Sequence, residues 1–517
     1  MVSHPRILLS SVFGPYGVDD AYGRKENIME LFHNQVTREQ GLFSFRFNHP
    51  SFGLSFIAEN LLCHTTVLDF PSEKRFIREI RKDYDFVGIS FIVPNFIKAK
   101  RMAQLVRMYA PKTKIILGGH GTAIQNIEKL ILHDHICRGE GIRFLRELIG
   151  QDPKDPIVHG IHSASSEKYL MGVPLANDSA VLLPGVGCKN GCDFCCTSKF
   201  FGKKYIPFLK TGRELFEVCL RAEKERGITE FFVMDENFLK QRDRAEEFLA
   251  ELERNNKHYL FSIFSSAETI KDVGIEFLKR MGVFWIWIGM EGKKSPYAKN
   301  HGVDFRQLVA ELRANGISIL GSVILFTEEH DKNSIYEDIN FAIDVAPDFI
   351  QFMQLGPMPG TTLYEQYDKR GLLLKDVPFE EWHGQHQIWF KHPHFTAEES
   401  EIYLRKAFKL AYDKLGSSLL RVFETTLMGY LSTLNETRPS LVARNLYFKK
   451  LCAGYYPGLS VIINKTPNKK ELLLAKKLKG RYEEAFGPMT PVQKIQSVIA
   501  HGLATIESFR IENKTDL

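Results

Sequence analysis

The chain has 517 residues, of which 44% are hydrophobic and 25% are charged, with a formal net charge of +6. This length predicts about three domains of roughly 150 residues each. The composition is typical of a soluble globular protein. No stretch approaches the ~20 apolar residues that a membrane span needs, the N-terminus lacks the pattern of a secretory signal, and no nucleic-acid module is recognisable. We therefore expect a cytoplasmic protein without a nucleic-acid partner.

Part of the positive charge lies late in the chain, in a run of Lys and Arg between residues 449 and 481. A solvated helical face is the ordinary explanation for such a run. Attraction to an anionic membrane surface or to an acidic substrate is the alternative.

The first 150 residues alternate between strand and helix patterns. Strand-like segments are 6–12, 65–69, 86–91 and 114–118, and helical segments are 53–62, 73–82 and 96–109. This alternation predicts a doubly wound parallel sheet, a Rossmann-like α/β domain with helices on both faces. Ligands of such sheets bind at the carboxyl ends of the strands, where glycines let backbone approach closely. Those ends carry three groups: Ser90; Gly118, Gly119, His120 and Gly121; and Arg138, Gly139 and Glu140.

Residues 151–178 are rich in Asp, Pro, Ser and Gly, and we predict that they form a linker. The strand and helix alternation restarts at residue 179 and defines a second α/β domain over 179–380. Its expected strands are 180–186, 230–234, 260–264, 284–290, 318–326 and 349–355, with helices such as 213–226, 242–255, 275–281 and 304–314 between them. In barrels of parallel strands, the working groups lie at the carboxyl ends of the strands.

Three cysteines, Cys188, Cys192 and Cys195, form a C-x3-C-x2-C cluster flanked by glycines. Thiolates are the preferred ligands of iron–sulfur clusters, and three of them leave one iron of a four-iron cluster open. A structural zinc site would need a fourth Cys or His, usually in a second close pair, and the chain has no such pair. Chance clustering of buried thiols is the other alternative. Cys196 falls outside the motif and is expected to be a small packed thiol.

The cysteine motif, with Phe194 before its last cysteine, resembles the radical S-adenosylmethionine (radical SAM) superfamily. The resemblance implies a partial (β/α)6 TIM-like barrel, a 4Fe-4S cluster on the three cysteines, and SAM that chelates the open iron and is cleaved to a 5′-deoxyadenosyl radical. It also implies an electron donor such as flavodoxin or ferredoxin. The positions it assigns to SAM are Phe194, Asp235, Glu236, Asn237, Gly289, Glu291, Ser322 and Gln354. A carboxylate at a strand end can instead be a helix N-cap.

The first 150 residues resemble the cobalamin-binding domain that precedes many radical SAM domains. The resemblance lies in the glycine motifs described above and in two segments that precede them in the chain, Asn48-His-Pro-Ser-Phe-Gly and Val67-Leu-Asp-Phe-Pro. The resemblance assigns cobalamin to Ser90, Gly118, Gly119, His120, Gly121, Arg138, Gly139 and Glu140. The segment from Gly356 to Thr362 is similar to one found in cobalamin-dependent relatives. The D-x-H-x-x-G motif, whose His ligates cobalt in other cobalamin proteins, is absent after the first strand. The lower axial ligand is therefore open, and loss of cofactor binding is the alternative.

Residues 381–517 are expected to form a helical substrate or cap domain that shapes the mouth of the barrel. The helical segments are 402–415, 418–431, 441–451, 470–486 and 490–506. The segment from Trp382 to Phe395 is rich in His and aromatic residues. Aromatic packing over the barrel mouth is the expected reason, and a second metal site is the alternative.

These features together predict a cobalamin-dependent radical SAM enzyme, a methyltransferase that acts on an unactivated carbon. The domain order resembles the lipid-tailoring branch that includes hopanoid methylases, which implies a lipid or isoprenoid substrate and leaves a natural product or peptide as the alternative. A radical enzyme that cyclises, rearranges, oxidises or cross-links its substrate without net methylation is the second hypothesis. A non-catalytic cobalamin-binding or redox-sensing protein is the third. The sequence assigns no catalytic acid or base.

Overall fold

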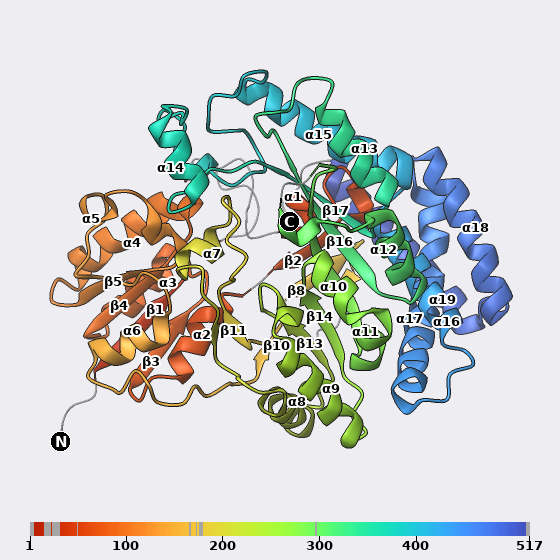
Figure 1. Cartoon of the computed structure of the whole chain (residues 1–517), viewed down its shortest axis with the longest axis horizontal. Helices are drawn as coiled ribbons and strands as arrows, with labels where there is room; N and C mark the ends of the chain where they lie inside the picture. Colours follow the sequence, from red (N-terminus) through yellow and green to blue (C-terminus); the bar gives the residue numbers. More distant parts are fainter. Residues whose placement is uncertain are drawn as a thin grey trace.

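The structure is a computed structural model that describes residues 5–14, 22, 31–48, 50–164, 167–171, 173–174, 179–294 and 297–512. Two parallel sheets and a set of C-terminal helices follow one another along the chain. The N-terminal sheet lies on one side of the central sheet, and the helices α16 to α19 lie on the other side (Figure 1).

The N-terminal sheet has five parallel strands in the order β3-β1-β4-β5-β6. Their bounds are β1 Arg6–Ser10, β3 His64–Leu68, β4 Phe86–Ser90, β5 Lys114–Gly118 and β6 His135–Ile136. Helices α3 (Glu73–Ile80) and α4 (Phe96–Tyr109) share an apolar cluster with one face of the sheet. Helices α2 (Phe52–Glu59) and α6 (Gly141–Leu148) share another cluster with the opposite face. The order is that of flavodoxin-like folds, in which ligands bind beyond the carboxyl ends of the strands.

The central sheet has six parallel strands in sequential order, β10-β13-β14-β15-β16-β17. Their bounds are β10 Ser179–Leu182, β13 Glu230–Val233, β14 Leu260–Phe264, β15 Val283–Glu291, β16 Ser318–Leu325 and β17 Phe349–Gln354. A short strand, β7 (His162–Ser163), pairs antiparallel with β10 at one edge, and β17 forms the other edge. The sheet therefore does not close into a full barrel. These two sheets confirm the predicted fold class.

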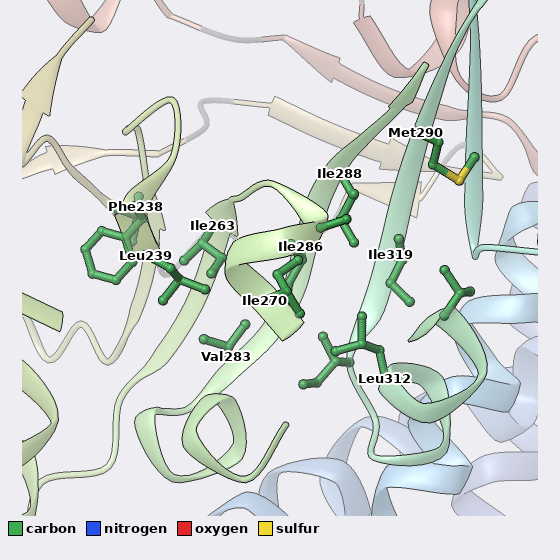
Figure 2. Close-up of a cluster of buried hydrophobic side chains, with 14 of the residues drawn as sticks. Phe238, Leu239, Ile263, Ile270, Val283, Ile286, Ile288, Met290, Leu312 and Ile319 are labelled. Carbon is green, nitrogen blue, oxygen red and sulfur yellow. The ribbon is translucent and has the colours of Figure 1, made fainter. Parts of the chain in front are cut away.

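Alternating residues of the central strands pack outward under the helices. Ile263, Ile286, Ile288 and Ile319 are fully buried and meet Ile270 of α10 (Ala267–Val273) and Leu312 of α12 (Phe305–Ala314), as Figure 2 shows. Because side chains of a strand alternate between its two faces, the residues between these positions line the inner face of the sheet. The inner face is where cavities form, as described below.

The remaining helices complete both α/β units. They are α1 Leu31–Gln35, α5 Ile127–Leu130, α7 Cys196–Phe200, α8 Gly212–Arg226, α9 Arg242–Arg254, α11 Ile275–Met281, α13 Ile335–Val345, α14 Thr362–Lys369 and α15 Ala397–Leu415. Helices α8 and α15 each begin with a capping box, formed by Thr211 with Glu214 and by Thr396 with Glu399. Such reciprocal caps satisfy backbone N–H groups that the first turn leaves unpaired.

The segment 151–178 contains strands and is more than a linker. Besides β7 it holds β8 (Glu167–Leu170), which pairs antiparallel with β2 (Phe45–Asn48), and β9 (Val173–Pro174). Residues 165–166, 172 and 175–178 lie outside the described part of the chain. Strands of two to four residues carry too little alternation to be read from sequence, and the partner strand lies more than 100 residues away.

The C-terminal helices lie at the amino ends of the central strands, and not at the mouth where the prediction placed them. They are α16 Ser418–Ser432, α17 Pro439–Lys465, α18 Lys469–Phe486 and α19 Pro491–Glu512. Arg444 of α17 donates to the carbonyl oxygens of Asn315 at 3.2 Å and Gly316 at 3.4 Å, immediately before β16 begins. None of the described helices is both long and apolar enough to cross a membrane.

Candidate functional site

The three cysteines of the motif lie in one tight loop between β11 (Gly185–Val186) and α7. Gly187 and Gly191 adopt φ values of +87° and +68°, a region that favours glycine. Within the loop, the backbone N–H of Cys195 donates to the carbonyl oxygen of Cys192 at 3.2 Å. The hydroxyl of Ser198 donates to the carbonyl oxygen of Cys188 at 3.0 Å. All three thiols are half-buried and none is in a disulfide, so the loop presents three free thiols together.

The chemistry of the three thiols fits an iron–sulfur cluster. Within the described ranges, no three His, Cys, Asp or Glu side chains are placed to hold one metal ion. A four-iron cluster distributes its cysteine ligands over separate iron corners, so its thiols do not converge on one point. Burial raises the pKa of Cys188 and Cys192, and raises that of Cys195 to about 11. Binding of iron would therefore release protons from this loop.

A cavity of about 320 Å³ opens on the inner face of the central sheet, near the carboxyl ends of β15, β16 and β17. Of the eight positions expected to contact SAM, five line it: Phe194, Gly289, Glu291, Ser322 and Gln354. We call it the SAM-side cavity. The segment after β17 supplies further walls that the sequence did not assign, among them Met358, His383 and Trp389.

Glu291 forms a partly buried ion pair with Lys299, a residue that the sequence analysis missed. Glu291 ends β15 with φ of +62°, where the pairing with β16 shifts register. The ammonium of Lys299 lies 5.9 Å from the ring centroid of Phe194, and its positive charge lowers the pKa of the Cys192 thiol against the effect of burial. A side chain at Gly289 would collide with Glu291 and would come within 2.7 Å of the Lys299 ammonium. Lys299 therefore places a positive charge close to the cysteine loop.

Gln354 lines the SAM-side cavity and contains a buried acceptor without a partner in the described part of the chain. Its amide nitrogen donates to the His386 carbonyl oxygen and to the Ser400 hydroxyl, both at 3.2 Å. Its carbonyl oxygen Oε1 is buried and has no hydrogen-bond partner among the described residues. Buried polar atoms are normally hydrogen-bonded, so this side chain stands out among the residues of the cavity wall.

Ser322 has its hydroxyl engaged within the protein. It accepts from the indole N–H of Trp287 at 2.6 Å and donates to Oε1 of Gln351 at 2.8 Å. The hydroxyl lines the SAM-side cavity from this fixed position.

The side chains of Asp235 and Asn237 do not line the SAM-side cavity. Asp235 is buried, with its carboxylate 2.8 Å from the Arg244 guanidinium and 2.6 Å from the Tyr205 hydroxyl. Asn237 donates to the hydroxyl of Ser266 at 2.8 Å. These two side chains hold the loop after β13 in place, so at Asp235 and Asn237 only the backbone is left to meet a ligand.

Glu236, the third residue of this loop, differs from its neighbours. Its side chain is accessible to solvent although protein surrounds it on most sides. This crowding and the negative charge of Asp235 raise its pKa to about 7. The negative charge of Glu236 also raises the pKa of Cys188, which indicates that the carboxylate lies near the thiol loop.

A second cavity, of about 250 Å³, lies at the carboxyl ends of the N-terminal strands. Six of the eight positions expected to contact cobalamin line it: Ser90, Gly118, Gly119, His120, Gly139 and Glu140. A side chain at Gly118 would project into open space, whereas one at Gly119, with φ of +83°, would meet the Phe91 carbonyl oxygen at 2.6 Å. Gly121 does not line the cavity and instead packs under the Phe91 ring. The glycine-lined walls leave room for part of a large cofactor, so the residues fit cobalamin.

His120 lies 4.5 Å from the Phe200 ring, measured between ring centroids. Burial lowers the pKa of His120 to about 4, so its imidazole is neutral at physiological pH. Glu140 has the alternative role of a helix cap, because its carboxylate accepts from the backbone N–H groups of Ile142 at 2.5 Å and Arg143 at 3.0 Å. Most of the segment from 13 to 23, which lacks the D-x-H-x-x-G motif, lies outside the described residues.

A third cavity, of about 510 Å³, lies between the two α/β units, and Arg138, Cys196 and Thr197 are among its lining residues. We call it the interdomain cavity. It shares His120 and Phe200 with the N-terminal cavity, and Met358 and His383 with the SAM-side cavity. The three cavities therefore lie next to one another in a row from the N-terminal sheet to the cysteine loop, and we call this row the path.

The aromatic and His-rich segment after residue 381 packs over this path. The indoles of Trp382 and Trp389 are stacked, with centroids 5.6 Å apart. His386 lies between Glu381 and Glu401, 3.0 Å from the latter. In the described residues this segment forms no metal-ligand group. The aromatic side chains of this segment pack against one another, as the stacked pair Trp382 and Trp389 shows.

Family models match both α/β units. A model of the B12 binding domain matches residues 42–149, and a model of the radical SAM superfamily matches residues 182–342. These ranges contain the glycine-lined cavity and the cysteine loop, respectively.

Relatives extend the similarity over most of the chain. An uncharacterized methyltransferase of Pyrococcus horikoshii is 22% identical over 424 residues, which cover 72% of this chain and 90% of the relative. An anaerobic magnesium-protoporphyrin IX monomethyl ester cyclase of Rubrivivax gelatinosus is 23% identical over 54% of this chain and 58% of the relative. The radical SAM methyltransferase TsrM of Kitasatospora setae, solved with tryptophan and a SAM analogue, has a TM-score of 0.54 at 14% identity, over 86% of this chain and 99% of that one. The TsrM likeness extends to the overall fold.

Proposed function

The chain is a radical SAM enzyme with an N-terminal B12-binding domain, and we propose that it is a methyltransferase. In this proposal, a methyl group moves from cobalamin to an unactivated carbon of a small-molecule substrate. The observation that carries the proposal is the path of three adjacent cavities. A cofactor held at the N-terminal sheet and one held beside the cysteine loop would both face the interdomain cavity. A substrate in that cavity would lie between them.

The assignment of cofactors to residues is part of the proposal. Cys188, Cys192 and Cys195 would hold the cluster, while Phe194, Gly289, Glu291 and Gln354 would contact SAM. Gly118, Gly119 and His120 would contact cobalamin. When bound, the cluster with SAM supplies a carbon-centred radical and cobalamin supplies the methyl group.

The protein's own contribution is orientation, charge and exclusion of water. Lys299 places a positive charge beside the thiols and holds Glu291 at the wall of the SAM-side cavity. Gln354 offers one fixed acceptor. Trp389 covers the path from the side of the C-terminal segment, and both its ring and its indole N–H are fixed, the latter donating to the Pro357 carbonyl oxygen at 3.1 Å. Such a closed site protects a reactive radical from side reactions.

The proposal includes two kinds of partner. An external one-electron donor such as flavodoxin or ferredoxin would reduce the cluster. An anionic membrane surface would attract the C-terminal helices, because residues 439–512 carry twelve Lys and Arg against five Glu, a net charge of +7. Basic residues near an anionic bilayer each contribute about 1 kcal/mol. A lipid or isoprenoid substrate would be consistent with such a surface.

Anaerobic turnover with SAM that carries a labelled methyl group tests the proposed function. We expect reduced, reconstituted enzyme to form 5′-deoxyadenosine and to transfer the label to bound corrinoid and then to product. The Cys192→Ala variant should lose most of its iron and all 5′-deoxyadenosine formation. Absence of 5′-deoxyadenosine from protein with a full complement of iron would contradict the proposal.

A second candidate is radical chemistry without net methyl transfer, and the similarity to a cyclase of Rubrivivax gelatinosus favours it. The same experiment separates the two candidates. Formation of 5′-deoxyadenosine without label in corrinoid or product would favour cyclisation, rearrangement or oxidation over methylation.

A further inference from the structure

A cavity of about 660 Å³ lies on the far side of the SAM-side cavity, at the amino ends of the central strands. We call it the lower chamber. Its walls come from the starts of β13, β15, β16 and β17 and from helices α16, α17 and α19. Ligand pockets for small molecules typically have volumes of about 300–1,000 Å³, so the lower chamber has the size of a ligand site. None of the residues assigned above to the cluster, SAM or cobalamin lines it.

The walls of the lower chamber are apolar and aromatic. Among the 29 described residues that line it, eleven are aromatic and two, Glu230 and Lys450, are charged. The aromatic walls include Trp285, Phe349 and Phe423. Cavities lined in this way stay dry and favour apolar ligands, because transfer of apolar surface out of water is favourable.

One residue, Trp287, lines both the lower chamber and the SAM-side cavity. Its ring stacks on Phe264, with centroids 5.2 Å apart. Its indole N–H donates to Ser322, Ser322 donates to Gln351, and the Gln351 amide donates to Gln35 at 3.3 Å. This hydrogen-bonded layer is the partition between the two cavities. The lower chamber is therefore next to the place where the SAM-side chemistry would occur.

The lower chamber borders the protein surface at α17 and α19. Gly454 of α17 and Gln496 of α19 line it and are exposed. A side chain at Gly454 would meet no atom within 4 Å. Val492 and Ile499, which lie on the same face of α19 as Gln496 because they are four and three residues away, are exposed apolar residues. An apolar molecule that reached this surface would find an apolar entrance.

We propose that the lower chamber binds the hydrocarbon chain, aliphatic or isoprenoid, of a lipid that enters from the surface between α17 and α19. This inference goes beyond the proposed function, because Trp287 and its hydrogen-bonded neighbours separate the lower chamber from the SAM-side cavity. The apolar walls disfavour a charged chain, since burial of an unpaired charge is costly. Molecules without a long apolar portion would leave the chamber unfilled.

Binding of a fluorescent polyene fatty acid, cis-parinaric acid, to the full-length, cluster-loaded protein tests the proposal. We expect saturable binding that geranylgeraniol or stearic acid displaces. The Gly454→Trp variant fills the entrance and should weaken binding by about tenfold, a change of about 1.4 kcal/mol. The matched control is Gly480→Trp in α18, another helical glycine at which a side chain meets no atom within 4 Å and which does not line the chamber.

The outcomes separate this inference from the proposed function. Failure of the wild-type protein to bind the probe, or an equal loss of binding in both glycine variants, would overturn the lower chamber as a ligand site. Both variants should keep wild-type iron content and wild-type 5′-deoxyadenosine formation in the absence of substrate, which shows that they are folded. Binding that Gly454→Trp weakens, in a protein that forms no 5′-deoxyadenosine, would support the chamber and contradict the proposed function.

Discussion

The ion pair between Glu291 and Lys299 occupies space that a side chain at residue 289 would share. Gly289 lies under the ion pair between Glu291 and Lys299, with the ammonium 2.7 Å from where a side-chain carbon would begin. Gly289 and Glu291 are recognisable from the sequence, whereas Lys299 is not. No motif marks Lys299, because it lies in a short 3-10 helix, Ala298–Asn300, and pairs with Glu291 only in the folded chain.

The Gly289→Ala variant should bind SAM about tenfold more weakly, which is about 1.4 kcal/mol. The added methyl group forces the ion pair apart, and overpacking of this kind typically costs about 1–3 kcal/mol. Equilibrium binding of SAM to anaerobically reconstituted protein measures the effect, with iron content as the check on the cluster. Gly480→Ala, in an open helical position, is the control. Unchanged SAM affinity in Gly289→Ala would show that the pair does not position the ligand.

Asp235 serves the structure of its loop. Its carboxylate and the guanidinium of Arg244 are almost completely buried and lie 2.8 Å apart. Removal of one partner from a buried pair typically costs about 3–5 kcal/mol, because the other charge stays buried without compensation.

We therefore expect Arg244→Met to lower the free energy of unfolding by about 3 kcal/mol, measured by urea denaturation followed by circular dichroism. Arg242→Met on the same helix removes an exposed pair with Glu246, and surface pairs of this kind contribute about 0.3–0.5 kcal/mol. Equal destabilisation by the two substitutions would contradict the structural role of the Asp235 pair.

At the scale of elements, α17 differs most from expectation. The predicted helix ended at residue 451, and it is followed by the helix breakers Gly454, Pro457 and Gly458. The helix runs through them to Lys465, held by buried neighbours such as Tyr456 and Leu459. Those breakers line the lower chamber. The small or rigid residues that weaken the helix thus leave the chamber open.

Helix α19 carries an exposed apolar stripe, in which each residue is more than half exposed: Val492, Ile495, Val498, Ile499, Ile506 and Phe509. Its buried residues, such as Ser497 and Ala504, lie on the opposite face. Exposed apolar patches on soluble domains mark interaction surfaces. The net charge of +7 over the last three helices is the reason for proposing an anionic bilayer as the occupant.

The protein should co-sediment with vesicles that contain phosphatidylserine, and less with purely zwitterionic vesicles or at high salt, because charge attraction is screened. Combined Ile495→Glu and Ile499→Glu substitutions should reduce binding at least about tenfold. Leu473→Glu on α18, an exposed leucine outside the stripe, is the control. The alternative is that the stripe forms a dimer interface. In that case the wild-type protein would not bind vesicles, and size-exclusion chromatography would show a dimer that the double substitution dissociates. This result would contradict the membrane proposal.

At the scale of the whole molecule, the sequence predicted what local patterns and strand order determine. Four site residues lie at or near the carboxyl ends of predicted strands: Ser90, Gly118, Gly289 and Gln354. The carboxyl ends of parallel strands meet at one edge of a sheet. These residues line the expected cavities. The position of the C-terminal helices could not be read in this way, because it depends on contacts such as Arg444 with Gly316, 128 residues apart. The position of His383 in the walls of two cavities likewise depends on how the two α/β units pack against each other.

The path between the cavities gives the last prediction. Met358 and His383 line both the interdomain cavity and the SAM-side cavity. If the two cavities communicate there, as the proposed function requires, Met358→Trp should narrow the passage without touching the cysteines. We expect normal iron content, normal corrinoid binding and normal 5′-deoxyadenosine formation, but at least about a tenfold slower transfer of labelled methyl from SAM to bound corrinoid, since small misplacements can cost about a hundredfold in rate. Met108→Trp, at an exposed position on α4, is the control. Methyl transfer at the wild-type rate in Met358→Trp would mean that the two cofactors do not meet through this passage.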